Sequence, residues 1–274
     1  MVETGFLSES DFSQYRKLIS EESGIHFTPT NRSILESRLK ERLREVGVDT
    51  PQRYYSMLVK DGEELKSFLD SVTTNLTRFF RNQAHFDALE KFVIPELFKI
   101  KSGMHNNTIK VWSAGCSTGE EPYSIAMLLS EILPPPWKFD VIASDISLSS
   151  LMVGRKGFYA DSRIAGVPDA YLKKYFNRIE SEGYQAKPDL MSKIHFDYHN
   201  LTHDSGQRNV DVVFCRNVII YFDEPTQLGV MKRFWDVMAS KSFLFIGHSE
   251  SLFGMDTSFE FVKTPWATLY RKFT

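Results

Sequence analysis

The 274-residue sequence has little cysteine and no long apolar run. Its two cysteines, Cys116 and Cys215, lie far apart and neither belongs to a C-x-x-C pair, which argues against a disulfide framework and a zinc site. No apolar run approaches the roughly 18 residues of a membrane-spanning helix, and the first residues, MVETGFLSESDF, do not resemble a signal peptide. We therefore expect a protein of the reducing cytoplasm that spans no membrane.

The sequence also lacks an excess of either charge. Its 33 Lys and Arg residues are balanced by 35 Asp and Glu residues, for a formal net charge of −2. This balance leaves no general electrostatic footprint for nucleic acid. With 42% hydrophobic and 25% charged residues, the chain is typical of a soluble globular protein with one large domain or two unequal ones.

Residues 1–72 carry apolar side chains at helical spacing, which predicts a small all-helical N-terminal domain. A capping box from Ser8 to Asp11 precedes the first helix, Gly47 ends the second, and Thr50 and Pro51 begin the third. The apolar stripes of the first, second and fourth helices are Phe12, Tyr15, Leu18 and Ile19; Leu35, Leu39, Leu43 and Val46; and Leu65, Phe68, Leu69 and Val72.

Residues 73–274 alternate predicted strands with predicted helices, the pattern of a parallel sheet with right-handed crossovers. After TTNLTRFFR, residues 73–81, we expect a helix over about 84–100. The expected strands are IKVWSA, KFDVIASD, KIHFDYHNL, VDVVFCRN and SFLFIGHSE, followed by two strands of FEFVKTPWATLYRKF around the Thr264-Pro265 turn. A sheet that ends in such a hairpin differs from a plain dinucleotide fold and is usual for S-adenosylmethionine methyltransferases.

The stretch VWSAGCSTGEEPYSIA places a glycine-containing turn between a strand and a helix. Glu120 and Glu121 stand where a phosphate would lie, so a pyrophosphate ligand is disfavoured. The sulfonium and ammonium groups of S-adenosylmethionine are compatible with a carboxylate. Asp145 ends the next strand at the spacing at which an acid binds ribose hydroxyls. A purely structural turn whose acids complement the helix dipole remains the alternative.

Further polar residues follow later strands, at the carboxyl ends where open α/β sheets bind ligands. Asn200 and Leu201 follow the third strand, and Arg216 and Asn217 follow the fourth. An Asn there can read an adenine edge or simply cap the loop backbone. Arg216 ends a very apolar strand and must reach solvent or a partner.

The motifs TTNLTRFFR, WSAGCSTGEEPYSIA, ASDIS, FCRNVIIYF and LFIGHSE, in that order, resemble the chemotaxis receptor methyltransferases, the CheR-type protein-glutamate O-methyltransferases. The resemblance covers nearly the whole chain. It implies a receptor-recognition domain over 1–72 and an α/β, Rossmann-like catalytic domain over 73–274 that ends in an antiparallel hairpin and contains an inserted small β-subdomain at about 155–196. The implied activity is methyl transfer from S-adenosylmethionine, without a metal, to glutamate side chains on the cytoplasmic domain of bacterial chemoreceptors, with S-adenosylhomocysteine as product.

The resemblance also implies the residues of the site. Asp145 should bind the ribose, and Arg81 and Tyr221 should act near the transferred methyl. Without the resemblance, Tyr221 reads as a strand-end aromatic. Glu120 is assigned to the helix start, and His248 to a structural hydrogen bond. The implied cofactor contacts are Asn75, Thr77, Arg81, Glu121, Asp145, Asn200, Leu201, Arg216 and Asn217; Asn75 and Thr77 read otherwise as caps of a helix after residue 78.

The reaction that the resemblance implies asks little of these side chains. A glutamate with a pKa of about 4.3 is already ionised near neutral pH and needs no general base. The negative carboxylate and the positive sulfonium become two neutral groups as the methyl is transferred. A pocket that excludes water and aligns the carboxylate with the methyl therefore favours the reaction. We expect Arg81 and Tyr221 to orient the carboxylate, with only partial contact from Arg81, because a tight bidentate clamp would lower its nucleophilicity.

The helix NRSILESRLKERLREVG suggests the partner. We expect its basic residues Arg38, Lys40, Arg42 and Arg44 to face acidic receptor helices. A solvated face balanced by Glu41 and Glu45 is the alternative. The predicted turn SEGYQAKPD in the inserted segment is short and lacks a glycine-rich stretch, so we do not expect it to grip a pentapeptide tether at the receptor C-terminus.

Three other classes of protein share parts of these patterns. A nicotinamide dehydrogenase should prefer G-x-G-x-x-G in the turn, and a nucleic-acid methyltransferase should carry an Asn-Pro-Pro-Tyr type motif where this chain has RNVIIYF. A non-catalytic receptor adaptor is disfavoured by Arg81, Asp145 and Tyr221. A regulatory protein partner is left open, and we expect no nucleic acid and no membrane insertion.

Overall fold

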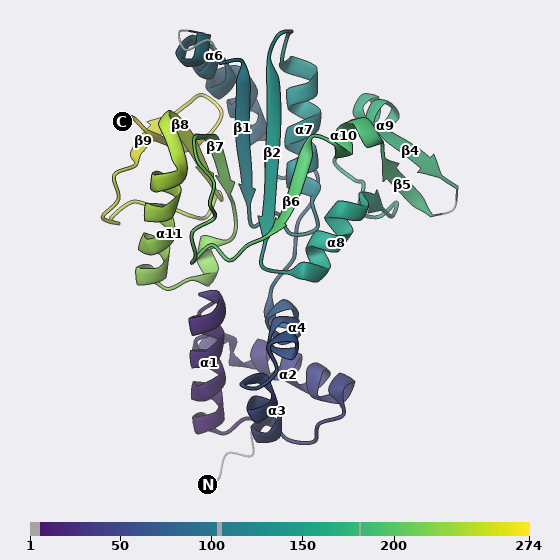
Figure 1. Cartoon of the computed structure of the whole chain (residues 1–274), viewed down its shortest axis with the longest axis vertical. Helices are drawn as coiled ribbons and strands as arrows, with labels where there is room; N and C mark the ends of the chain where they lie inside the picture. The colour runs from purple at the N-terminus through teal and green to yellow at the C-terminus, as the bar shows by residue number, and fades with distance from the viewer. Residues whose placement is uncertain (1–5, 103–105, 181) are drawn as a thin grey trace. The chain divides into compact units, whose positions relative to one another are not determined.

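The computed structural model describes residues 6–102, 106–180 and 182–274. Its chain divides into two compact units, each with a hydrophobic core of its own. The first unit comprises the residues up to Thr74 together with Ile220–Gln227, and the second comprises Asn75–Ile219 and Leu228–Thr274. Figure 1 colours the chain from purple at the start of the first unit to yellow at the end of the second.

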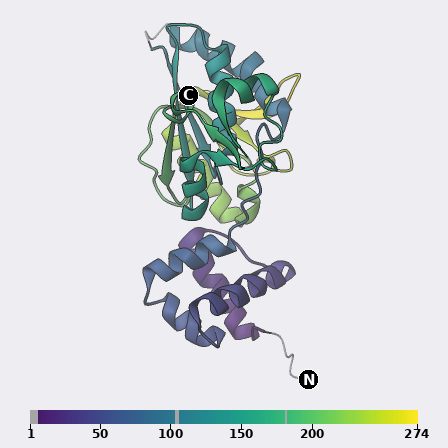
Figure 2. The ribbon, with the colours of Figure 1, turned by 90° about the vertical axis from the view of Figure 1, so that its right-hand side faces the viewer.

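The first unit is helical, as the apolar periodicity predicts (Figure 2). The capping box is formed, because Asp11 N donates to Ser8 Oγ at 3.0 Å while Ser8 N donates back to the Asp11 carboxylate. Gly47 ends the second helix in the left-handed conformation, and Thr50 caps the third. The helices are α1 (Glu9–Ser23), α2 (Arg32–Val46), α3 (Pro51–Leu58) and α4 (Gly62–Val72), with a 3₁₀ turn at Pro29–Asn31.

Aromatic rings and one ion pair hold the first unit together. The fully buried Phe68 meets Tyr15 and Tyr54 edge-to-face, with ring centroids 5.7 Å apart in each pair. Arg42 of α2 grips Glu64 of α4 through two hydrogen bonds of 2.8 and 2.7 Å, and the Tyr54 hydroxyl donates to the same carboxylate. Arg42 is therefore part of the internal structure of this unit.

The 220–227 segment joins the first unit although it lies far along the chain. It begins within a 3₁₀ turn, Ile219–Tyr221, and Phe222 forms an antiparallel bridge with Ile25. His26 N donates to the Tyr221 carbonyl at 2.7 Å. Backbone pairing thus fixes this segment against the end of α1.

The second unit contains a seven-stranded sheet in the order β6-β2-β1-β7-β8-β10-β9. The five strands from β6 to β8 are parallel, and β10 runs antiparallel to both β8 and β9, which confirms the predicted sheet and closing hairpin. The chain leaves β1 toward β2 and later returns to β7 on its other side, so the strand order reverses at β1, where open sheets bind ligands. The strands are β1 (Thr108–Ala114), β2 (Lys138–Asp145), β6 (Ile194–Tyr198), β7 (Val210–Cys215), β8 (Met238–Ile246), β9 (Glu260–Lys263) and β10 (Thr268–Lys272).

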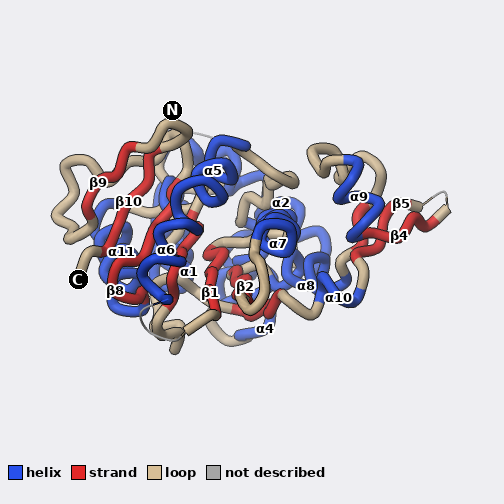
Figure 3. The backbone as a smooth tube through the Cα atoms, turned by 90° about the horizontal axis from the view of Figure 1, so that it is seen from above, coloured by secondary structure: helices blue, strands red, loops and turns tan. Residues whose placement is uncertain are grey.

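Helices cover both faces of this sheet, which explains the nearly continuous burial of β1 and β7. On one face Phe214 stacks near Phe86 of α5 (Gln83–Ala88), and α7 (Glu120–Ile132) lies beside β2 and β6 (Figure 3). On the other face Trp112 meets Phe234 of α11 (Glu224–Val237) edge-on at 5.3 Å. A π-helical turn, Leu89–Val93, joins α5 to α6 (Ile94–Ser102), in place of the single predicted helix.

A small antiparallel sheet forms the inserted β-subdomain, in the order β3-β5-β4. The β4–β5 pairing closes at Ile179 and Gly183, and Ser181 of the predicted turn lies outside the described residues. The segment ends before β6, which pairs with β2 in the large sheet. The helix α8 (Leu148–Lys156) leads into the segment and contacts β2 and β6 of the large sheet. The elements of the segment are β3 (Phe158–Tyr159), α9 (Asp169–Tyr175), β4 (Phe176–Ile179), β5 (Gly183–Ala186) and α10 (Pro188–Met191).

The turn between β1 and α7 requires glycine for two reasons. Gly119 has φ +96°, in the left-handed region, and a Cβ there would lie 2.9 Å from both the Gly154 Cα and the Tyr159 hydroxyl oxygen. Gly115 has φ +84°, and its Cβ would lie 2.4 Å from a methyl group of Val218. The turn therefore brings α8 and the segment after β7 closer than any side chain permits.

We predict that Gly119→Ala lowers the free energy of unfolding of the second unit by about 3 kcal/mol or more. Two costs add: the strain of a left-handed backbone at an alanine, and the clash of its Cβ with the Gly154 Cα. Gly206→Ala is the matched control, since Gly206 has φ +68° but nothing within 4 Å of its Cβ position; about 1 kcal/mol is expected from strain alone. Urea unfolding followed by tryptophan fluorescence measures both, because all four tryptophans lie in the second unit. Equal losses would contradict the close packing.

Candidate functional site

The carboxylate of Asp145, at the end of β2, joins the two turns that follow β1 and β2. One oxygen accepts from Ser117 N at 2.7 Å and the other from Ser147 N at 2.9 Å. The Ser117 hydroxyl is buried and has no hydrogen-bond partner within the described part of the chain. The carboxylate accepts hydrogen bonds and the buried hydroxyl can donate or accept, a combination that fits a ligand with vicinal hydroxyls, such as a ribose.

Glu121 and Arg216, predicted as separate ligand contacts, form a buried ion pair. Arg216 Nε donates to Glu121 Oε2 at 2.7 Å, and the Ser113 hydroxyl donates to Oε1 at 2.7 Å. Arg216 Nη1 donates to the Arg81 carbonyl at 2.5 Å and lies 3.2 Å from His85 Nδ1. Glu121 is therefore not a carboxylate open to a cationic ligand, as its position in the sequence suggests, because Arg216 supplies its counter-ion.

His85 is a member of this network that the sequence analysis did not single out. Burial lowers its pKa to about 3, and the positive charge of Arg216 adds to the effect. The imidazole is therefore neutral at physiological pH, and Nδ1 accepts from Arg216. A polar residue within the apolar pattern of α5 is the sequence signal that could have identified it.

The segment 75–81 runs as a loop along the site. The α5 helix begins only at Gln83, after Asn82, so the alternative reading of Asn75 and Thr77 as helix caps is wrong. Asn75 Nδ2 donates to Ser147 Oγ at 3.4 Å, and Thr77 is half-buried. Arg81 Nη1 donates to the Leu76 carbonyl at 2.8 Å, so this guanidinium stabilises the loop on which the predicted contacts lie.

The predicted adenosine contacts lie in tight turns. The Asn200 side-chain oxygen accepts from the backbone N and the hydroxyl of Thr202, both at 2.9 Å, so this amide organises its own loop, and Leu201 beside it is buried. Asn217 has φ +59°, and its backbone N donates to Glu250 at 2.8 Å. The structure assigns the structural hydrogen bonds of the GHSE motif to Glu250, whereas His248 has an exposed side chain.

Glu120 lies in the first turn of α7, but its carboxylate is buried in a pairing that the sequence analysis missed. Its Oε2 accepts from the Thr118 hydroxyl at 2.7 Å, and its Oε1 pairs with Arg163 of the inserted segment. Glu120 therefore connects the turn after β1 to the loop that follows β3 in the inserted segment.

Tyr221 belongs to the first unit, where its carbonyl accepts from His26 N. Its expected place near the transferred methyl stays a prediction.

Within the described ranges, no group of three or more His, Cys, Asp or Glu side chains could hold a metal ion. Over the same residues, no helix has the length and apolar character needed to cross a membrane.

The lowered pKa of His85 predicts a pH-dependent stability. Its folded pKa of about 3 lies below the unfolded value of 6.5, so its contribution is present above pH 6.5 and is lost as the pH falls, because only the unfolded chain takes up the proton. Between pH 7.5 and 5 we expect the parent to lose about 2 kcal/mol more than His85→Gln, which retains an acceptor for Arg216. Urea unfolding at the two pH values tests this, and equal losses would mean that His85 titrates normally.

Comparison with known proteins identifies the family of both units. The family described as CheR methyltransferase, SAM binding domain, matches residues 75–268, and the family described as CheR methyltransferase, all-alpha domain, matches residues 10–73. Chemotaxis protein methyltransferase of Borreliella burgdorferi is 36% identical over 256 residues, covering 90% of each chain. The proteins of the same name from Salmonella typhimurium and Escherichia coli are 37% and 35% identical, covering 89% and 94% of this chain and 85% and 90% of theirs. The chain therefore belongs to the CheR methyltransferase family, and S-adenosylmethionine is its cofactor.

Proposed function

We propose that this chemotaxis methyltransferase transfers a methyl group from S-adenosylmethionine to glutamate side chains on the cytoplasmic domains of bacterial chemoreceptors. The observation that carries the proposal is the identity of 35–37% with chemotaxis protein methyltransferases over about nine tenths of the chain. The products are glutamate methyl esters and S-adenosylhomocysteine. The enzyme acts from the cytoplasm at receptors held in the membrane.

The polar side chains that follow the strands of the large sheet supply the proposed contacts to S-adenosylmethionine. Asp145 and the orphan Ser117 hydroxyl bind the ribose. Asn75 and Thr77 bind the amino-acid end, next to a floor made by the paired Glu121 and Arg216. The remaining contacts surround the adenosine: Asn200, Leu201 and Asn217.

S-adenosylmethionine supplies an electrophilic methyl group. A carboxylate oxygen of the target forms the new O–C bond as the C–S bond breaks, the electron pair stays on sulfur, and no proton is transferred. The protein therefore needs no base, and its contribution is alignment and exclusion of water. Arg81 and the Tyr221 hydroxyl orient the incoming carboxylate without neutralising it fully.

The chemical test uses S-adenosylmethionine with a labelled methyl group and a receptor cytoplasmic fragment. Label in the fragment should be released by mild base as methanol, since esters hydrolyse where N-methyl and ether products do not. A fragment with its target glutamates changed to alanine is the control. Base-stable label, or transfer to RNA in place of the fragment, would contradict the proposal.

Tyr221→Phe should lower kcat several-fold and leave the affinity for S-adenosylhomocysteine unchanged, because it removes only a hydroxyl expected at the reacting carboxylate. Steady-state kinetics and calorimetric titration separate the two quantities. If a stably folded Tyr221→Phe variant had the same kcat as the parent, Tyr221 would have only a structural role.

We further propose that residues 1–72 recognise the receptor and that 73–274 perform catalysis. The basic residues of α2 do not contribute alike. Arg38 lies 3.6 Å from the Glu41 carboxylate, and Arg44 is exposed. Arg42, in contrast, forms ion pairs with both Glu64 and Glu45. Lys40 lies 4.8 Å from the ring of Phe6 and is exposed to solvent. The basic side chains of α2 that remain available to an acidic receptor helix are therefore Lys40 and Arg44 on one flank and Arg38 on the other.

Reversing Arg38 and Arg44 to Glu should raise the apparent KM for the receptor by about tenfold at low salt, with a smaller effect at 0.15 M, where screening acts beyond about 8 Å. Arg42→Glu should instead destabilise the first unit, because it leaves the buried Glu64 without its partner. Methylation assays over a salt series and thermal unfolding distinguish the two variants. Unchanged KM in the double variant would remove α2 from the interface.

Deleting the receptor's C-terminal tail should change the rate of methylation by less than about twofold. The β4–β5 hairpin is short, and we infer that it holds no pentapeptide. A large loss in the same assay would contradict this.

A further inference from the structure

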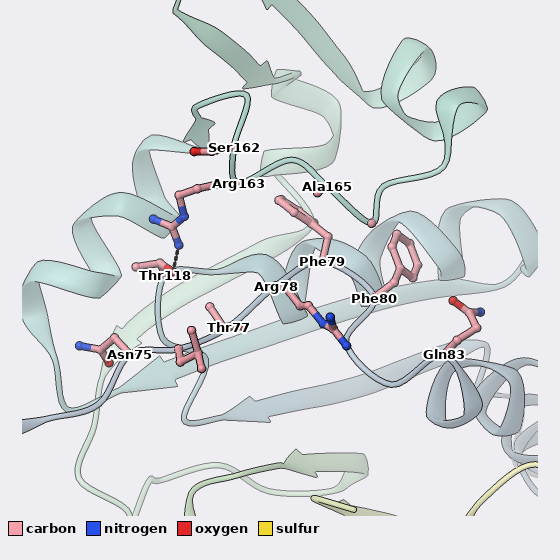
Figure 4. Close-up of a pocket in the computed structure, with 12 residues that line it drawn as sticks. Asn75, Thr77, Arg78, Phe79, Phe80, Gln83, Thr118, Ser162, Arg163 and Ala165 are labelled. Atoms are coloured by element: carbon pink, nitrogen blue, oxygen red, sulfur yellow. Dashed lines mark hydrogen bonds between the residues drawn. The ribbon is translucent and has the colours of Figure 1, made fainter.

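A cavity of about 730 Å³ lies beside the proposed cofactor contacts, within the second unit. Figure 4 shows Ser162 and Arg163 on one side of it and Thr77, Arg78 and Gln83 on the other. Its size is that of a ligand site. The lining residues are Asn75, Leu76, Thr77, Arg78, Phe79, Phe80, Gln83, Thr118, Ser162, Arg163, Ala165 and Gly166.

The walls of this cavity are held in place by contacts between distant segments. The Tyr159 hydroxyl donates to the Thr118 carbonyl at 2.8 Å, and the Phe79 ring packs edge-on against Tyr159 at 4.9 Å. Phe80 N donates to Ser124 Oγ at 2.9 Å. A Cβ on Gly166 would lie 2.7 Å from the Phe79 carbonyl oxygen, so the two walls meet closely at one end. The cavity is thus built by contacts between distant segments of the second unit.

The charge of the cavity comes from one residue. Arg163 is neutralised by the buried carboxylate of Glu120 and also donates to the Thr118 hydroxyl. The Gln83 amide is turned to Asp87 at 3.0 Å. Arg78 is exposed, and among the residues that the structure describes no carboxylate lies within ion-pair distance of it. Its guanidinium therefore presents a charge that the protein does not balance locally.

Apolar side chains surround this charge. Leu76 has 78% of its surface exposed, and Phe80 is half-buried against Phe86 and Tyr171. A cation next to exposed apolar surface complements a carboxylate that is followed by an apolar residue. Such a surface suits an acidic protein segment better than a free small anion, which would leave Leu76 in water.

We propose that this cavity binds the acidic receptor segment next to the target glutamate, and that Arg78 recognises a carboxylate there and so helps to select the glutamate that is methylated. The inference rests on the proposed function. Asn75 and Thr77 line both the cavity and the proposed cofactor contacts, so a segment held by Arg78 lies beside the methyl donor. Arg78 acts in specificity and takes no part in the chemical step.

The test compares Arg78→Glu, Arg78→Lys and Lys138→Glu with the parent on a receptor cytoplasmic fragment. Lys138→Glu is the matched control, because Lys138 is exposed and begins β2, at the end of the strand opposite Asp145. Arg78→Glu should raise the apparent KM for the fragment by about tenfold with the Kd for S-adenosylhomocysteine unchanged, while Arg78→Lys and Lys138→Glu stay within about twofold. Thermal unfolding verifies that each variant is folded.

A second arm changes the substrate. Glutamates next to the methylated positions are replaced by Gln, which should raise KM for the parent and leave KM for Arg78→Glu unchanged or lower. Equal effects of both Glu substitutions, or a weakened Kd for S-adenosylhomocysteine in Arg78→Glu, would overturn the inference, the latter by assigning the cavity to the cofactor. If the parent forms no base-labile ester on the fragment at all, the proposed function itself fails.

Discussion

The buried ion pair between Glu121 and Arg216 is the interaction on which the catalytic unit depends. Two charges removed from water are stable only when their remaining hydrogen-bonding groups also find partners. Here Ser113 satisfies the carboxylate, while His85 and the Arg81 carbonyl satisfy the guanidinium. The pair thereby ties β1, α7, β7, α5 and the 75–81 loop together at the point where the strand order of the sheet reverses.

The two glutamates that follow Gly119 have separate structural tasks. Glu121 turns toward the sheet and meets Arg216, and Glu120 turns toward the inserted segment and meets Arg163. Each of the two acids in this turn is therefore paired with an arginine, and neither carboxylate is left without a counter-ion. The same arrangement fixes the cavity beside Arg78, because Arg163 is part of its wall.

Much of the fold could be predicted from the sequence because its signals are local. Apolar spacing, the Ser8–Asp11 capping box and Gly47 set the helices of the first unit, and the apolar runs that end at Asp145 and Cys215 set the parallel strands. Side-chain partners far apart in sequence were not predictable. Spacing gives no indication that Arg216 meets Glu121 or that the 220–227 segment pairs with the first unit. A glycine-containing turn with an acid after the next strand also suits other nucleotides. The prediction of S-adenosylmethionine therefore depended on the five motifs in their order along the chain.

The central claim, that the Glu121–Arg216 pair keeps the proposed cofactor site in shape, is tested most directly by a double-mutant cycle on the affinity for S-adenosylhomocysteine and on stability. Glu121→Gln and Arg216→Met each leave one charge buried without its partner, and each should cost about 3–5 kcal/mol of stability and weaken binding. The account predicts that the double variant is clearly more stable than the sum of the two losses implies, because no unpaired charge remains. Strictly additive losses, or single variants with parental stability and affinity, would contradict it.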